Sequence, residues 1–209
     1  MALIAGLAKA SEIALKEETD LIFHMLKHKL RLLIGIRNSF TESVVLKDNQ
    51  RDKPLTTWKD KLELVIKLNG PSKSNDADFV LEDIKVLRSI LADSNNDNKH
   101  DIVLYQLPNT LSISFRDVNA SNLIENLSNK VACSAGSACH SDVHELSSVL
   151  KAMNIDPIWG LGTLRLSWGR HTTEEEIEKA IASIAKEVKK LKKLPNDEPK
   201  LSTDAFPWG

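Results

Sequence analysis

Hydrophobic residues recur at steps of three or four through the first forty residues. This spacing places them on one face of a helix that we predict to end near Asn38 and Ser39. A helix of this length exceeds the usual length in globular domains, which predicts that it connects or braces domains. The positions that define it are Leu3, Ile4, Leu7, Ile13, Ala14, Leu21, Ile22, Met25, Leu26, Leu30, Leu33 and Ile34.

Four shorter segments have the character of β-strands. Residues 61–68 are strand-like and stop at a strong turn signal, Asn69-Gly70-Pro71. Residues 110–115 alternate apolar with hydroxyl side chains, and residues 162–168 form the last strand. A short strand is predicted at residues 130–133, before the small residues 134–138. The pattern predicts an α/β or α+β fold.

Helices are predicted at residues 120–129 and 146–153, and a strong final helix runs from Thr173 to residue 191. Thr173 and Glu176 have the spacing of a capping box, and lysines at the far end of this helix suit its dipole. Polar flanks around residues 72–101 indicate an insertion with its own amphipathic helix, and residues 195–209 read as a flexible tail. We therefore expect an interdomain helix at 1–40 and one domain at 41–194.

Composition narrows the class of protein. The chain has 209 residues, with 28 basic against 29 acidic side chains. Near-zero net charge gives no general reason to expect a nucleic-acid or acidic-membrane partner. Two cysteines are too few for a secreted disulfide scaffold, no apolar run is long enough to span a bilayer, and no basic signal-peptide region is present. These features predict a cytoplasmic protein.

Both cysteines lie in one short segment, which leaves three hypotheses for their chemistry. In the first, Cys133 is a buried strand residue and Cys139 a thiol without function. In the second, both cysteines bind a metal with His140 and His144, although the five residues between them do not match common zinc sites. In the third, Cys139 is a nucleophile, uncovered by the small residues before it and activated by a nearby imidazole or substrate cation.

Arg165 interrupts the last predicted strand. Leu164 and Leu166 point to one face of this strand and Arg165 to the other, so its guanidinium is either solvated or aimed at a cleft. A planar guanidinium on a rigid strand suits a bidentate carboxylate contact. His24 and His28 are four residues apart on the first helix; a third metal ligand is lacking nearby, so we expect a surface pair.

Several motifs, in this order, resemble the cysteine desulfurase and selenocysteine lyase family of the class V aminotransferase superfamily. The resemblance implies the small C-terminal domain of a type I fold pyridoxal-phosphate enzyme, with a long N-terminal helix and a small, mostly antiparallel sheet covered by helices. It covers residues 1–190 except the insertion. The motifs are Ile4-Ala5-Gly6-Leu7-Ala8-Lys9-Ala10, Leu107-Pro108-Asn109-Thr110, Gly136-Ser137-Ala138-Cys139, Ser148-Val149-Leu150-Lys151-Ala152-Met153 and Leu164-Arg165-Leu166-Ser167-Trp168-Gly169-Arg170.

The resemblance also implies roles for individual residues. Cys139 would attack or protonate the sulfur or selenium of a cofactor-bound L-cysteine or L-selenocysteine, which leaves L-alanine. Arg165 would hold the substrate carboxylate, and His140 could tune the thiol. Cys139-His140-Ser141-Asp142 looks more like selenocysteine lyases than housekeeping desulfurases. A homodimer, or pairing with a full-length homologue, is the implied assembly.

The chain departs from this family at the cofactor. The family's His-Lys stretch, with the lysine that binds pyridoxal phosphate, has no counterpart here, because His28-Lys29 lies within the predicted first helix. No residue is therefore assigned to cofactor or metal binding. We expect a truncated protein that is inactive alone. The alternative is a non-catalytic interaction or regulatory fragment that pairs with a full-length homologue or a sulfur acceptor.

Overall fold

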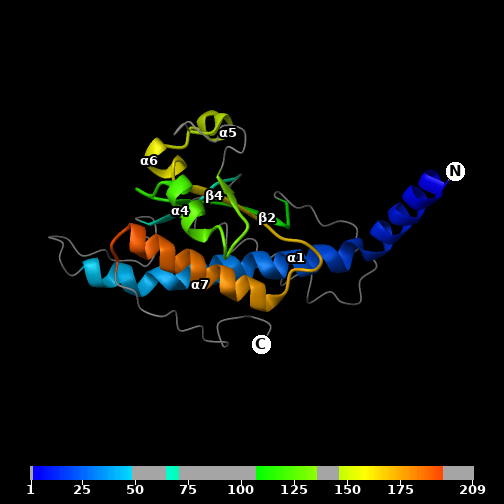
Figure 1. The fold of residues 1–209 in the computed structure, drawn as a ribbon, viewed down its shortest axis with the longest axis horizontal. Helices are drawn as coiled ribbons and strands as arrows, with labels where there is room; N and C mark the ends of the chain where they lie inside the picture. The colour runs from blue at the N-terminus through cyan, green and yellow to red at the C-terminus, as the bar shows by residue number, and fades with distance from the viewer. Residues whose placement is uncertain (1, 49–64, 71–106, 136–145, 195–209) are drawn as a thin grey trace.

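The computed structural model describes residues 2–48, 65–70, 107–135 and 146–194. A long helix, α1 (Ala2–Asp48), runs the full width of this described part (Figure 1). The predicted end at Asn38 and Ser39 is wrong. The Ser39 hydroxyl donates to the Gly35 carbonyl at 2.8 Å, a contact inside the helix. Phe40 is fully buried, and its ring lies 6.1 Å from that of Phe115. Tertiary packing therefore extends the helix beyond Asn38 and Ser39, where the sequence alone predicted its end.

The sheet has four strands in the order β1-β2-β4-β3, and every neighbouring pair is antiparallel. The strands are β1 (Ile66–Leu68), β2 (Thr110–Phe115), β3 (Ser134–Ala135) and β4 (Thr163–Ser167). The expected strand at 130–133 is wrong. Lys130 and Val131 donate backbone N–H groups to the Leu127 carbonyl, so the chain is still turning there and pairs with β4 only from Ser134.

The remaining helices are α4 (Ala120–Leu127), α5 (Ser148–Ala152), α6 (Pro157–Gly160) and α7 (Glu174–Leu191). The capping box of α7 is confirmed: Thr173 Oγ1 accepts from the Glu176 N–H, and the Glu176 carboxylate accepts from the Thr173 N–H. The short α6 was not predicted; Asp156 caps it by accepting from the Ile158 N–H. The predicted insertion at 72–101 and tail at 195–209 lie outside the described residues.

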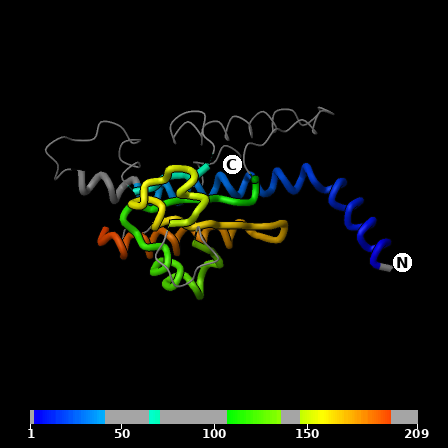
Figure 2. The backbone as a smooth tube through the Cα atoms, turned by 90° about the horizontal axis from the view of Figure 1, so that it is seen from above, coloured from blue at the N-terminus to red at the C-terminus, as the bar shows by residue number. Residues whose placement is uncertain are grey.

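One face of the sheet packs against α1 and α7, and this layer is the hydrophobic core. Figures 1 and 2 show both helices along the same side of the strands. Burying this apolar surface is the main stabilising contribution to such a fold. The predicted class, a long helix with a small antiparallel sheet covered by helices, is confirmed. Fully buried core side chains include Ile36, Phe40, Ile113, Phe115, Leu123, Leu127, Leu164, Ile181, Ile184 and Val188.

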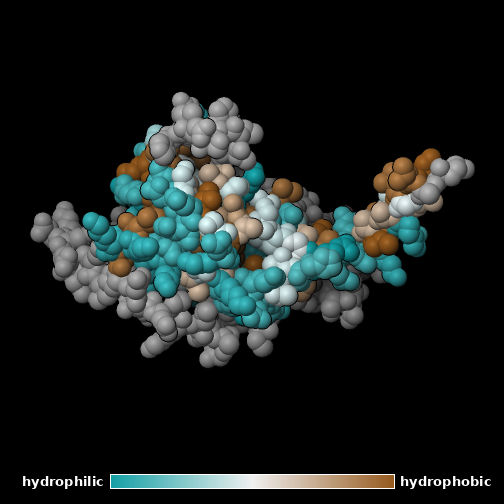
Figure 3. Space-filling view, viewed as in Figure 1, coloured by the Kyte–Doolittle hydropathy of each residue, from teal (hydrophilic) through white to brown (hydrophobic). Residues whose placement is uncertain are grey.

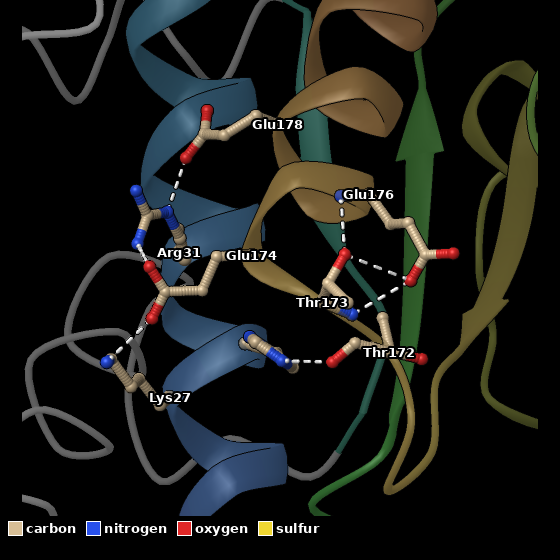
Figure 4. Close-up of polar contacts among 8 residues, drawn as sticks. Lys27, Arg31, Thr172, Thr173, Glu174, Glu176 and Glu178 are labelled. Atoms are coloured by element: carbon tan, nitrogen blue, oxygen red, sulfur yellow. Dashed lines mark hydrogen bonds and ion pairs between the residues drawn. The ribbon is translucent and has the colours of Figure 1, made fainter.

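Polar contacts fasten α1 to the start of α7 (Figure 4). Arg31 binds both Glu174, at 2.6 Å, and Glu178, and Lys27 binds Glu174 at 2.7 Å. The expected surface pair of histidines is wrong, because His28 is 1% exposed and its Nε2 lies 2.9 Å from the Thr172 carbonyl. The turn before α7 covers this face of α1. The burial of His28 could not be predicted from the residues near it in the sequence, because the turn lies far along the chain.

The N-terminal part of α1 extends past the rest of the protein (Figures 1 and 2). We call residues 3–18 the α1 overhang; all its side chains are exposed, including Leu3 at 90%, Leu7 at 69% and Leu15 at 74%. Figure 3 shows its outer end as a hydrophobic surface. Within the described part of the chain, no helix is both long and apolar enough to cross a membrane.

Candidate functional site

Alternation along β2 and β4 separates two faces of the sheet. Apolar side chains on one face belong to the core, whereas the opposite face carries only hydroxyl side chains and one arginine. The register pairs Thr110 with Ser167, Ser112 with Arg165, and Ser114 with Thr163. Residues that face each other in neighbouring strands point to the same side, so these six residues form one polar surface.

Arg165 lies in the middle of this surface. Ser112 of β2 is its register partner on one side, and Ser134 of β3 is its partner on the other. Asn69 follows β1 and extends the same row, since its backbone N–H donates to the Ser112 carbonyl at 3.0 Å. We call Asn69, Ser112, Arg165 and Ser134 the polar row. It crosses all four strands in sheet order.

The Arg165 side chain is exposed and makes no hydrogen bond or ion pair with any described residue. The prediction that it points away from Leu164 and Leu166 is confirmed, because both leucines are buried on the core side. An arginine without a protein anion offers five N–H donors in a planar group. The polar row is therefore the best candidate in the described chain for binding an anion.

A buried hydrogen-bond network supports one end of the row. The Asn69 Nδ2 donates to Ser114 Oγ at 2.7 Å and to Ser112 Oγ at 3.2 Å. Ser114 Oγ and Thr163 Oγ1 lie 2.7 Å apart, and both residues are almost fully buried. The alternating hydroxyls of residues 110–115 were visible in the sequence. Their contact with Asn69 was not, because it depends on strand pairing between distant segments.

The structure describes one of the two cysteines. Cys133 is half-buried just before β3, and burial raises the pKa of its thiol, so it stays protonated at neutral pH. Cys139, His140 and His144 lie outside the described residues, so their predicted roles stay predictions. Among described residues, no three His, Cys, Asp or Glu side chains gather as metal ligands.

The lysine of the His28-Lys29 pair does not fit a cofactor anchor. Lys29 is 2% exposed, and its Nζ donates to the Leu107 carbonyl at 3.3 Å. It lies on α1, which covers the core face of the sheet, whereas Arg165 points from the opposite face. The structure thus offers no reason to assign a Schiff-base role to Lys29.

A cavity of about 280 Å³ lies between α7 and the end of β4, and its lining includes Trp168 and Ile177. The charged groups at its edge are already engaged. Glu176 belongs to the capping box, Lys130 binds Glu187 at 2.8 Å, and Lys179 binds Glu175 at 2.7 Å. The charged side chains of this cavity are therefore less available to a ligand than Arg165 in the polar row.

Comparison with known proteins gives several matches. Cysteine desulfurase IscS of Vibrio atlanticus is 40% identical over 89 residues, which are 43% of this chain and 22% of that protein. Cysteine desulfurase IscS of Vibrio vulnificus is 34% identical over 115 residues, 55% of this chain and 26% of that protein. The mitochondrial cysteine desulfurase of Arabidopsis thaliana is 40% identical over 84 residues, 40% of this chain and 18% of that protein. No protein-family model matches.

A solved structure of a NifS-like protein covers 90% of this chain and 33% of its own chain, with a TM-score of 0.50 and 23% identity. This likeness supports the fold. The chain spans about a quarter or less of the length of the curated relatives cited above. Part of this chain is therefore homologous to cysteine desulfurases, and its long helix and small antiparallel sheet match the C-terminal region of a NifS-like protein.

Proposed function

We propose that this chain supplies substrate-binding and sulfur-handling residues for a cysteine desulfurase-like reaction. In this reaction sulfur or selenium leaves L-cysteine or L-selenocysteine, and L-alanine remains. The observation that carries the proposal is the position of Arg165, an exposed cation without a described anionic partner in the centre of the polar row. Partial homology to cysteine desulfurases supports the same class of substrate.

Arg165 is suited to hold the α-carboxylate of an amino acid. A guanidinium and a carboxylate form two parallel, charge-assisted hydrogen bonds, which fix both position and orientation. The rigid strand beneath Arg165 limits the freedom lost on binding, because β4 is hydrogen-bonded on both sides. Loss of the guanidinium should remove about 1.5–3 kcal/mol of binding free energy.

Cys139 is proposed as the residue that attacks the sulfur or selenium. The bond from this atom to Cβ of the substrate breaks, Cys139 keeps the atom as a persulfide or selenosulfide, and Cβ takes up a proton to become the methyl group of L-alanine. Cys139 follows Ala135 by four residues, and four residues span at most about 14 Å. Ala135 pairs with Leu164, the neighbour of Arg165, so Cys139 follows in sequence within five residues of Ser134, a member of the polar row. His140 is proposed to promote the thiolate, and the resemblance of Cys139-His140-Ser141-Asp142 to selenocysteine lyases is the reason for including selenocysteine among the proposed substrates.

The chemistry also needs pyridoxal phosphate, which supplies an electron sink when it is bound. The described residues do not fit this cofactor, because Lys29 is buried on the far side of the sheet from Arg165. We therefore expect the chain alone to be inactive. Purified with added pyridoxal phosphate, it should show neither an aldimine absorbance nor alanine formation, and either signal would overturn this expectation.

A complementation assay tests the catalytic proposal. The chain is mixed with a cysteine desulfurase fragment that lacks the region matched by this chain, and alanine formation from L-cysteine and L-selenocysteine is measured. Cys139→Ser should abolish product formation, whereas Cys133→Ser is the matched control and should retain it. Unchanged activity of Cys139→Ser in an active mixture would remove Cys139 from the mechanism.

The α1 overhang favours a second function, the non-catalytic pairing with a full-length homologue. Leu3 and Leu7 precede the buried residues Leu32 and Ile36 by about eight helical turns each, so they lie on the same face of α1. The apolar face that packs the core thus continues, uncovered, into the overhang. Such exposed apolar patches often mark binding surfaces, and the NifS-like protein has twice as much chain outside the matched part.

Size-exclusion chromatography with a full-length cysteine desulfurase tests this second function. Leu3→Glu combined with Leu7→Glu should abolish co-elution. Ala5→Glu combined with Lys9→Gln makes the same change in net charge on the opposite face of the overhang, and it should leave co-elution intact. Absence of co-elution for the unmodified chain, or equal loss in both variants, would contradict the pairing.

A further inference from the structure

His24 and His28 of α1 leave two ring nitrogens buried without a partner. The His24 Nε2 and the His28 Nδ1 are shielded from water, and neither has a hydrogen bond to any described group. The two rings are neighbours, with centroids 4.2 Å apart and ring planes at 70° to each other. Buried polar atoms are costly to leave unpaired, so a group that contacts both nitrogens would stabilise this region.

The hydrogen bond on the other nitrogen of His28 fixes which atom carries the proton. Its Nε2 lies 2.9 Å from the Thr172 carbonyl, and a carbonyl can only accept, so Nε2 holds the hydrogen. In the neutral ring, Nδ1 is then the nitrogen with an available lone pair. Histidines that bind metal ions usually donate their other N–H to a carbonyl or a carboxylate in this way. His28 is 1% exposed, so this lone pair is held in a buried position.

The distance between the two rings is close to that of two imidazoles bound to one metal ion. Two rings bound at right angles, with metal–nitrogen bonds of about 2.0–2.1 Å, place their centroids about 4.5 Å apart. Tetrahedral angles place the centroids about 5.2 Å apart. The observed 4.2 Å is closer to the first value. It therefore favours Cu²⁺ or Ni²⁺, which accept nitrogen ligands at right angles, over tetrahedral Zn²⁺.

We infer that His24 Nε2 and His28 Nδ1 form a two-nitrogen site for Cu²⁺ or Ni²⁺, where α1 meets the turn before α7. No third His, Cys, Asp or Glu joins them in the part of the chain that the structure describes. His24 is partly exposed, so water can occupy the remaining positions around the ion. Because α1 covers the core face of the sheet, this site is separate from the polar row and does not depend on the proposed role of Arg165.

The charges around the pair are balanced, so they do not oppose a cation. Lys27 and Arg31 lie within one helical turn of His28, and both bind Glu174 (Figure 4). Arg31 also binds Glu178. Two basic side chains are thus matched by two carboxylates. A metal ion beside His28 therefore meets little net repulsion from its surroundings.

Copper binding to the full chain tests the inference. Cys133→Ser combined with Cys139→Ser is the background, because it removes the thiols that would also bind Cu²⁺. Electron paramagnetic resonance spectra with substoichiometric Cu²⁺ should show hyperfine splitting from two imidazole nitrogens. His24→Gln should raise the Kd for Cu²⁺ by more than about 10-fold, since even the loss of a residue that only orients a ligand costs about 10- to 100-fold. His171→Gln, an exposed histidine outside the pair, is the matched control and should leave the Kd and the spectrum unchanged.

Nuclear magnetic resonance spectra of the histidine side chains place the ion at named atoms. In the metal-free chain His28 should carry its proton on Nε2, and Cu²⁺ should broaden the signals of His24 and His28 before those of the other four histidines. An unchanged circular dichroism spectrum of His24→Gln excludes unfolding as the cause of lost binding. A His28 proton on Nδ1, first broadening at other histidines, or equal Kd values for His24→Gln and the background chain would each refute the site.

Discussion

Among the glycines of the described chain, Gly162, directly before β4, is the one where an added Cβ meets backbone atoms most closely. A Cβ at this residue would lie 2.0 Å from the Phe115 carbonyl oxygen and 2.8 Å from the Val118 carbonyl oxygen. Both neighbours are backbone atoms, which cannot move aside as a flexible side chain can. Gly162→Ala must therefore displace the backbone where β2 ends and β4 begins.

The hydrogen bonds at this junction set the size of the effect. The Phe115 N–H donates to the Gly162 carbonyl at 3.0 Å, and the Ala120 N–H donates to the Leu161 carbonyl at 2.9 Å. Weakening both bonds costs about 1–2 kcal/mol, and overpacking adds about 1–3 kcal/mol. We expect a loss of about 2–5 kcal/mol in the free energy of unfolding, a large share of the 5–15 kcal/mol typical of proteins.

Urea denaturation followed by far-ultraviolet circular dichroism measures this loss. Gly169→Ala is the matched control, because a Cβ there meets no atom within 4 Å. It should be neutral, or stabilising by up to about 1 kcal/mol through the unfolded state. A Gly162→Ala variant within about 0.5 kcal/mol of the unmodified chain, the range of ordinary surface substitutions, would refute the packing argument.

Two further predictions concern the contact between α1 and α7. Burial lowers the pKa of His28 despite its hydrogen bond to the Thr172 carbonyl, so the unfolded chain binds this proton more readily than the folded chain. The free energy of unfolding should therefore fall as the pH drops below the unfolded pKa of 6.5. His28→Gln should flatten the curve of unfolding free energy against pH. Parallel curves for the variant and the unmodified chain would contradict the assignment to His28. Thr173→Ala removes the cap of α7 and should cost about 0.5–2 kcal/mol in urea denaturation, whereas Ser183→Ala inside the helix should cost nothing.

Local patterns predicted the elements of this fold well but not their ends. Asn38 and Ser39 form a reasonable local stop signal, yet Phe40 beyond them packs fully buried against the ring of Phe115. That contact joins segments far apart in the chain, so no window of sequence contains it. The capping box of Thr173 and Glu176 was predictable because all its atoms lie within one helical turn.

The candidate site could likewise be predicted only in part from the sequence. Alternation in residues 164–166 was enough to predict that Arg165 leaves the core face. Its neighbours Ser112 and Ser134 could not be predicted, because they depend on the register of three strands, and a slip of one residue would replace them with core residues. The burial of His28 was missed for a related reason, since the turn that covers it is contributed by residues near 172.

The polar face of the sheet carries two kinds of residue: buried ones that stabilise the fold, and an exposed arginine that is proposed to bind a ligand. Ser114 and Thr163 are buried there and bonded to each other, so replacing either with an apolar residue leaves a buried partner unsatisfied and should lower stability. Arg165 is exposed two residues further along β4, so its replacement should alter binding with little effect on stability. Ser112 lies between these two cases, because it is half-buried and its Oγ accepts a hydrogen bond from the Asn69 Nδ2 of the network. The network thus stabilises the strand register that places Ser112 beside Arg165, so a contact that stabilises the fold also positions residues of the candidate site.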